Sequence, residues 1–449
     1  MKKLQLIILL SFMLFNGCEK YLDQKSNKSF VIPSSVSDLQ ALLDENQRMN
    51  SKASSLGEVS ADNYYTTQEY LDMLSPQNAA AYKWDSAIFV NGAPSNDWSE
   101  TYDPAYYSNI VLEYIDDFNR NTSNSADWDN VKGSALFFRA KCFLEAAWIW
   151  AQAYDENSNT LGIPLRLNSD FNIPSTRATL QQTYDQVIDD LSAAISLLPI
   201  HPLFKTRPSK PAAYAVLART YLSMRRYEQA SLYADSCLQL YNSLLHYNAI
   251  DTTSAYPFER FNNETIFYSK MSSNYAVINN NYASVDTSLS NMYQINDCRN
   301  SLFFYQKSDN SKAFRGSYDG TVYLFNGIAT DELYLIKAEC EARAGHTSAS
   351  LKDLNTLIET RWKTGLFIPY IANNAQEALN IILKERRKEL LFRGLRWIDL
   401  KRLNKEGYAI TNNHPLGIQN FALLPNDNRY ALPLPDDILK ISGMQQNPR

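Results

Sequence analysis

Residues 211–240 constrain the fold most, because this stretch predicts two short helices of similar length joined by a tight turn. The first helix is predicted over AAYAVLARTYLSM and the second over YEQASLYADSCLQL, with Arg225 and Arg226 between them. Small alanines at the crossing points and bulky tyrosines beside them are typical of the tetratricopeptide helix–turn–helix unit of about 34 residues. One unit cannot bury its own apolar face, so the pattern predicts a stack of several helix pairs.

Helical patterns continue on the N-terminal side of this unit. Residues 129–154 contain no proline and are rich in alanine, leucine and phenylalanine, which predicts a long and largely buried helix. Residues 179–198 predict an amphipathic helix that Thr179 caps and Pro199 ends. Apolar residues at helical spacing over 97–118 predict a further helix, interrupted near Pro104.

The helical pattern also returns on the C-terminal side. A second repeat is predicted over 332–360, and a charged helix over 380–404 that breaks near Gly394. We therefore expect a mostly α-helical fold with tetratricopeptide-like repeat units at about 130–240 and 330–404. Residues 432–449 are punctuated by prolines and are expected to be irregular.

Residues 241–327 lack the helical rhythm. This stretch is dense in asparagine, serine and tyrosine, and it lies between the two predicted repeat regions. Its aromatic content favours an ordered structure over a low-complexity disordered segment. We expect a large irregular insertion that contains short strands.

The N-terminus has the three parts of an export signal. Lys2 and Lys3 precede an apolar run of about a dozen residues, and Asn16-Gly17 stands before Cys18. The apolar run is shorter than the roughly 20 residues that span a bilayer. Cleavage after Gly17 would leave Cys18 as the first mature residue, a thiol that can carry lipid. We therefore expect residues 1–17 to be a lipoprotein signal peptide and Cys18 to be the site of lipidation.

Charge and metal-ligand content exclude several classes of function. The formal net charge is −5, which disfavours binding to nucleic acid. The four histidines lie far apart and no zinc-site spacing is present, so neither a metal nor another cofactor is expected. Three cysteines other than Cys18 occur in helical patterns beside alanines and are expected to be small buried residues. They are Cys142, Cys237 and Cys340.

One charged segment could carry catalysis, but its composition argues against it. Glu385 and Glu389 could form the carboxylate pair of a glycosidase. Arg386, Arg387 and Arg393 are interleaved with them and would hold both carboxylates ionised, whereas a general acid needs a raised pKa. We expect a salt-bridged helix that locks the repeats together, with no catalytic residue and no enzymatic activity.

Several stretches, taken in order, resemble the SusD/RagB family of outer-membrane nutrient-binding lipoproteins of Bacteroidetes. They are Cys18-Glu-Lys-Tyr-Leu-Asp23, Lys132-Gly-Ser-Ala-Leu-Phe-Phe-Arg139-Ala140, Leu161-Gly-Ile-Pro164-Leu165, Tyr184-Asp-Gln-Val-Ile-Asp-Asp190-Leu, Glu385-Arg-Arg-Lys-Glu-Leu390, Gly394, Arg396-Trp397, Asp399-Leu-Lys-Arg402, Leu432-Pro-Leu-Pro435 and Gln446-Asn-Pro448. Any one piece is weak, but their joint order over nearly all of the mature chain is specific.

The resemblance implies a single SusD-like domain over 18–449, in which the helical repeats support a ligand-binding portion at about 241–327. It also implies a lipid-anchored, surface-exposed protein of the outer membrane, with a TonB-dependent transporter of the SusC type as its partner. The implied role is to bind a glycan nutrient and deliver it to that transporter. A peptide-binding, RagB-like member of the family and a helical-repeat scaffold without a small ligand are the alternatives.

Glycan binding needs flat apolar faces beside amides and carboxylates, and rigid aromatic side chains supply such faces at a small entropic cost. We take as candidates the aromatic residues that are flanked by polar residues and lie outside helix-spaced stripes. They are Trp98, Tyr64, Tyr65, Trp84, Tyr275, Tyr282, Tyr293 and Tyr318. Trp98 is the leading candidate, because it is expected in a polar, proline-flanked turn ahead of a helix. Trp148, Trp150 and Trp397 fall in buried helical patterns and are expected in the core.

Overall fold

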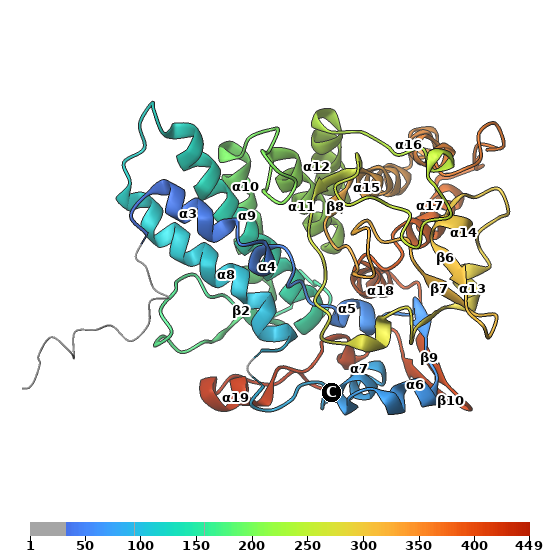
Figure 1. Cartoon of the computed structure of the whole chain (residues 1–449), viewed down its shortest axis with the longest axis horizontal. Coiled ribbons are helices and arrows are strands. Elements are labelled where there is room, and N and C mark those ends of the chain that lie inside the picture. Colours follow the sequence, from blue (N-terminus) through green and yellow to red (C-terminus); the bar gives the residue numbers. More distant parts are fainter. Residues whose placement is uncertain (1–32, 94, 157) are drawn as a thin grey trace, which may run out of the picture.

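The computed structural model describes residues 33–93, 95–156 and 158–449, and a row of helices dominates it (Figure 1). The predicted signal peptide and Cys18 lie outside the described residues. Each helix of the row packs against its neighbour. In chain order they are α8 (Asp97–Tyr114), α9 (Ser125–Trp150), α10 (Leu180–Leu197), α11 (Lys210–Ser223), α12 (Tyr227–Leu240), α15 (Thr330–Arg343), α16 (Thr347–Glu359) and α17 (Ala375–Glu389). The predicted mostly helical fold with paired helices is therefore confirmed.

Local sequence signals set several of these helix ends. Thr179 caps α10 in a reciprocal capping box with Gln182. Gly394 ends the α17 region with a φ of +74°, a conformation that side chains with a Cβ rarely adopt, and it separates α17 from α18 (Arg396–Lys405). Both features agree with the sequence predictions.

The predicted interruption at Pro104 is wrong, because α8 continues through this residue. A proline inside a helix removes one backbone hydrogen bond. Here α8 lies along α9 over much of its length, and Ala105 and Val111 are fully buried in the core. Tertiary packing therefore outweighs the local cost of the proline.

The insertion is irregular, as predicted, and contains short antiparallel strand pairs. Strand β4 (Thr265–Phe267) pairs with β8 (Ile328–Ala329) and so brings the two ends of the insertion together. The other pairs are β1 (Tyr64–Tyr65) with β5 (Ser284–Val285) and β6 (Phe304–Gln306) with β7 (Lys312–Phe314). The short helices of the insertion are η2 (Tyr247–Ala249), η3 (Ala276–Ile278), α13 (Thr287–Ser290) and α14 (Arg299–Leu302).

Short elements from both ends of the chain lie along the lower edge of the scaffold in Figure 1. From the N-terminal side these are α5 (Leu56–Val59), α6 (Gln68–Met73) and α7 (Pro76–Tyr82), preceded by α3 (Val36–Leu43) and α4 (Asn46–Met49). From the C-terminal side they are the hairpin β9 (Asn412–Leu416) and β10 (Gln419–Leu423), η4 (Asn428–Tyr430) and α19 (Asp436–Ser442). The short helix α19 departs from the irregular end that the prolines predicted.

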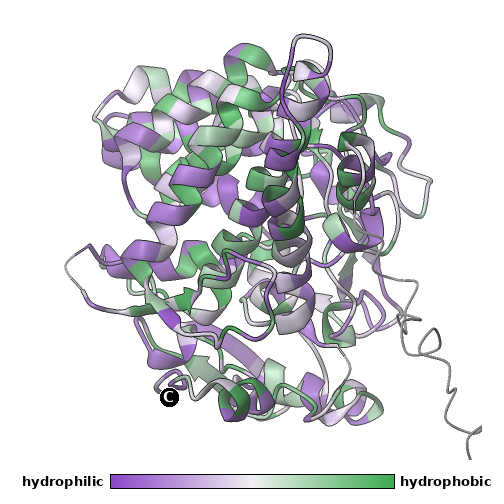
Figure 2. Ribbon diagram, turned by 90° about the vertical axis from the view of Figure 1, so that its left-hand side faces the viewer, coloured by the Kyte–Doolittle hydropathy of each residue, from purple (hydrophilic) through white to green (hydrophobic). Residues whose placement is uncertain are grey.

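The core draws on residues from Leu39 to Leu434, which belong to one connected cluster. Trp148, Trp150 and Trp397 are buried in it, as predicted. Cys142, Cys237, Cys298 and Cys340 are buried free thiols. Hydrophilic and hydrophobic residues are interspersed along the helices (Figure 2). Among the described residues, no helix combines the length and the apolar character needed to cross a bilayer.

Candidate ligand-binding cleft

A cleft of about 640 Å³ opens between three parts of the chain. The first turns of α8 form one wall, and α19 forms another. The third wall is the loop of residues 166–175, which connects β2 (Leu161–Pro164) to β3 (Arg177–Thr179) and is called here the 166–175 loop. In Figure 1 the N-terminal end of α8 approaches α19 at the lower left. A cleft of this volume suits a small ligand or a short stretch of a polymer.

Aromatic rings form the floor and one side of the cleft. Trp98 lies at the start of α8, with its ring centroid 4.9 Å from that of Tyr102 and 4.9 Å from that of the core residue Trp150. One turn further along, the ring of Tyr106 lies 4.9 Å from that of Phe171 in the 166–175 loop. Phe171 is 75% exposed, so its ring is available to a ligand.

A buried relay holds the 166–175 loop against the helices. Nδ2 of Asn109 donates to the backbone oxygens of Arg166 (2.7 Å) and Asn168 (3.2 Å). The Oδ1 atom of Asn109 accepts from Nη1 of Arg139 at 3.0 Å. Arg139 in turn donates from Nε and Nη2 to the two carboxylate oxygens of Asp190, at 2.8 and 2.7 Å. Residues from α8, α9 and α10 therefore act together to position this wall.

Two charged residues, Arg166 and Glu113, also hold the 166–175 loop in place. The guanidinium of Arg166 donates to the backbone oxygen of Ile173 at 2.5 Å, to Oγ of Ser175 at 3.2 Å and to the backbone oxygen of Asp170. The carboxylate of Glu113, on α8, accepts from the backbone nitrogen (2.6 Å) and hydroxyl (2.5 Å) of Ser169. The loop therefore presents Phe171 and Ile173 from a framework of hydrogen bonds.

The α19 wall is attached mainly at its ends. Gln446 accepts from the backbone nitrogen of Leu434 (2.8 Å) and donates to its backbone oxygen (2.9 Å), which closes the base of the segment. None of the residues of α19 is buried, and Ile441, which faces the cleft, is 85% exposed. The wall thus carries apolar surface that no other described part of the chain covers.

Trp98 lines the cleft although its side chain is buried, with 5% exposed, whereas five other predicted aromatic residues do not line it. Trp98 belongs to the first turn of α8, and not to a turn ahead of it. Tyr64, Trp84, Tyr275, Tyr293 and Tyr318 are all buried. Each has its polar atom satisfied; for example, the hydroxyl of Tyr293 donates to the backbone oxygen of Lys388 at 2.8 Å. Packed in this way, their rings offer no face to a ligand.

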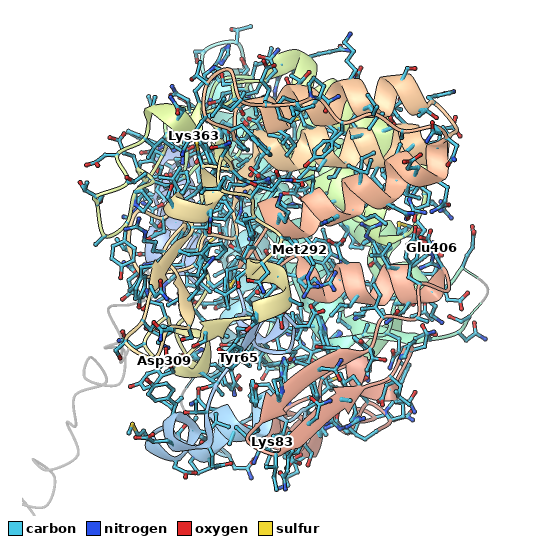
Figure 3. All side chains as sticks on the ribbon, turned by 90° about the vertical axis from the view of Figure 1, so that its right-hand side faces the viewer. Tyr65, Lys83, Met292, Asp309, Lys363 and Glu406 are labelled. Carbon is cyan, nitrogen blue, oxygen red and sulfur yellow. The ribbon has the colours of Figure 1, made fainter. Side chains whose placement is uncertain are left out.

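Tyr65 and Tyr282 are half-buried, and neither lines the cleft. Figure 3 shows Tyr65 near Asp309, on the side formed by the insertion. Tyr282 contacts Tyr70 of α6, with 5.8 Å between the ring centroids. The predicted residues therefore do not form one common site.

Polar neighbours were a poor guide to exposure because buried polar networks use them. Asp97 precedes Trp98 and is itself buried; its carboxylate accepts from Ser54 (2.6 Å), Ser272 (2.8 Å) and Asn274 (2.7 Å). The sequence reasoning missed Tyr106 and Phe171. Tyr106 belongs to the helical pattern of α8, which predicts core, and the signal that it reaches solvent is its position in the first turns of that helix.

The segment with Glu385 and Glu389 is an ion-pair cluster, as expected, but with other partners than the sequence suggested. Arg299 bonds both carboxylates, at 2.7 and 2.8 Å, and Arg361 bonds Glu389 at 2.7 Å. Lys388 adds a contact of 2.8 Å to Glu385. Although burial opposes ionisation, the facing Arg299 and Lys388 hold the pKa of Glu385 below its usual range. This carboxyl group stays ionised and cannot act as a general acid at neutral pH.

The adjacent arginines pair elsewhere. Arg386 bonds Asp399 at 2.9 Å and Arg393 bonds Asp331 at 3.2 Å. Since Arg299 lies in the insertion and Glu385 on α17, the cluster ties the insertion to the C-terminal helices. Among the described residues, no group of three or more histidine, cysteine or acidic side chains is arranged to hold a metal ion.

Two family models match the chain and together span most of it. A model described as "Starch-binding associating with outer membrane" matches residues 20–222, and the SusD family model matches residues 241–449. No protein with curated annotation matches the sequence.

Solved structures give the same picture of the fold. A putative sugar binding protein from Bacteroides vulgatus is 19% identical, with a TM-score of 0.75, and the match covers 93% of this chain and 99% of that one. A SusD superfamily protein from Bacteroides thetaiotaomicron is 20% identical, with a TM-score of 0.75, over 92% of this chain and 100% of that one. A laminarin-binding SusD-like protein is 17% identical, with a TM-score of 0.65, over 93% and 100%. With both halves of the sequence matched and the fold shared, the chain belongs to the SusD/RagB family.

Proposed function

We propose that this protein binds glycan nutrients and that the cleft between α8, the 166–175 loop and α19 holds the sugar chain. The observation that carries the proposal is the exposed ring of Phe171 beside Tyr106, in a cleft that Trp98 also lines. Sugar C–H faces rest on such rings, and the fixed aromatic side chains lose little entropy on binding. The names of the sugar-binding and laminarin-binding structural neighbours support the same class of ligand.

The proposed setting is the outer surface of the cell. Lipid on Cys18 would tether the protein to the outer membrane, since lipid anchors with more than one chain bind stably. In this setting the protein hands its glycan to a TonB-dependent transporter of the SusC type. Family membership and the description of the N-terminal family model support this part of the proposal.

Affinity electrophoresis of the mature protein in gels that contain one polysaccharide each tests the ligand class. The panel holds laminarin, starch, xylan, mannan, inulin and polygalacturonate. We expect at least one polymer to retard the protein and to remain uncut after incubation. Phe171→Ala should weaken that binding about tenfold, which corresponds to roughly 1.4 kcal/mol of lost contact.

Phe204→Ala is the matched control. Phe204 is also an exposed aromatic residue, but it lies outside the cleft, where its ring faces the guanidinium of Arg207. Its removal should leave retardation unchanged. Equal effects of the two variants would contradict the assignment of the cleft. Binding to a peptide library with no polysaccharide bound would favour the RagB-like alternative, and the absence of any ligand would favour the scaffold.

A further inference from the structure

Among the described residues, the lining of the cleft contains one carboxylate, Asp103, which is already paired with cations. Asp103 lies on α8 between two cations. Its Oδ2 atom is 3.0 Å from Nζ of Lys52 and 3.3 Å from Nη1 of Arg48. Arg48 lies in α4 and Lys52 follows it, so these two ion pairs are part of the packing of α4 on α8. The two cations more than balance the carboxylate, so Asp103 needs no cationic ligand.

The lining formed by the described part of the chain contains one cation, Arg166, which donates hydrogen bonds within its own loop. The two terminal nitrogens of Arg166 donate hydrogen bonds to Ile173, Ser175 and Asp170 of the 166–175 loop. The nearby carboxylate of Glu113 is likewise occupied by Ser169. These charged groups hold the wall in place through hydrogen bonds within the protein.

The polar atoms left for a ligand are neutral. Within the described part of the chain, the hydroxyl of Tyr106, Nδ2 of Asn168 and Oδ1 of Asn172 make no hydrogen bond to the protein. One hydroxyl and two amides can donate to and accept from sugar hydroxyls. Trp98, Phe171 and other apolar residues line the same cleft as these polar atoms.

The surroundings of the Tyr106 hydroxyl also disfavour its ionised form. The pKa of Tyr106 is raised, chiefly because the hydroxyl is partly buried, and further by Tyr107 and by the carboxylates of Glu113 and Asp103. An anionic group that entered the cleft would lose hydration, and the terminal nitrogens of Arg166 already donate within the 166–175 loop.

Resting on the proposed function, we propose that the cleft selects uncharged sugar chains and rejects chains that carry carboxylate or sulfate groups. Two features carry this inference. One is that Asp103 and Arg166 are satisfied within the protein. The other is the set of neutral hydrogen-bonding atoms on Tyr106, Asn168 and Asn172 beside the aromatic rings.

Matched polymers test the selectivity. Laminarin and carboxymethyl-laminarin share one backbone, as do starch and carboxymethyl-starch, so each pair differs only in the carboxymethyl groups that carry the charge. We expect the carboxymethylated polymer to bind at least tenfold more weakly than its parent. Binding of the parent should change less than twofold between 0.05 and 0.5 M NaCl, because no ion pair with the ligand is screened.

The outcomes separate the two proposals. A derivative that binds as tightly as its parent, or binding of polygalacturonate alone, would overturn the selectivity and leave the glycan-binding function standing. If no polysaccharide of the panel binds, the proposed function fails and the selectivity falls with it.

A charge added to the cleft gives a second test. Asn172→Lys should raise the affinity for carboxymethyl-laminarin relative to laminarin at least fivefold. Asn420→Lys adds the same charge in the hairpin at strand β10, away from the cleft, and should leave this ratio unchanged. If both variants change the ratio equally, the overall charge of the protein governs selectivity and the inference is wrong.

Discussion

Arg139 donates hydrogen bonds to both carboxylate oxygens of Asp190 across the α9–α10 interface, and both side chains are buried. The pair joins two scaffold helices and also positions the cleft wall. The remaining terminal nitrogen of Arg139 donates to Asn109, and Asn109 donates to the backbone of the 166–175 loop. Scaffold and cleft therefore share one hydrogen-bonded relay.

Breaking this pair should destabilise the whole fold. Asp190→Asn removes one partner and leaves the guanidinium buried without a counter-charge, which costs about 3–5 kcal/mol in comparable buried pairs. We expect a fall of this size in the free energy of unfolding, measured by urea titration. Arg120→Ala breaks the exposed pair between Arg120 and Asp129 and should cost less than about 1 kcal/mol. Equal losses in the two variants would contradict the role of burial.

Asn109→Ala should loosen the cleft wall more than the fold. The variant frees the backbone oxygens of Arg166 and Asn168, and each lost hydrogen bond costs about 0.5–1.5 kcal/mol. Amide hydrogen exchange should quicken at least tenfold in the 166–175 loop and remain nearly unchanged in α12 and α15. Uniform acceleration across these helices would show that Asn109 supports the scaffold as a whole and does not specifically position the loop.

Glu58 should make stability depend on pH. Burial raises the pKa of its carboxyl group to about 7 from an ordinary value of 4.5, although Asn63 and the backbone nitrogen of Gly394 donate to it. The folded state thus favours the protonated form. The stability that this group contributes is fully present below pH 4.5 and is lost as the pH rises through 7.

Comparison with Glu58→Gln isolates this contribution, because glutamine does not titrate. Between pH 4.5 and 8, the free energy of unfolding of the wild type should fall by about 3 kcal/mol more than that of the variant. Urea titrations at four pH values measure the difference. Parallel pH profiles would show that the carboxyl group is ionised in the folded protein throughout this range.

Cys18→Ser tests the anchor. Serine lacks the thiol that would carry lipid, so the variant should move from the membrane fraction to the soluble fraction of cells that express the full chain. A Cys298→Ser variant is the control, since Cys298 is a buried thiol of the insertion and is expected to leave the distribution unchanged. Continued membrane association of the Cys18 variant would contradict lipidation at this residue.

Helix positions were predictable because they depend on local signals. The capping box at Thr179, the turn at Arg225 and the break at Gly394 can each be read within a few residues of sequence. Arg225 and Gly394 both adopt positive φ angles, of 62° and 74°, where the helices end. Pro104 misled the prediction, since the packing of α8 on α9 is a tertiary effect.

The cleft was harder to predict because it depends on contacts between distant segments. Trp98 and Ile441 are more than 300 residues apart in the sequence, yet both line the same volume. The polar residues beside Tyr64 and Trp98 suggested exposure, but Asn63 and Asp97 bond to buried partners instead. Only the fold distinguishes an asparagine that faces solvent from one that completes a buried network.

A crystal structure of the protein with the oligosaccharide that binds most tightly tests the central claim most directly. We predict sugar rings stacked on Phe171 and Tyr106, between the 166–175 loop and α19. Sugar bound only on the insertion side, around Tyr70 and Tyr282, would contradict the account.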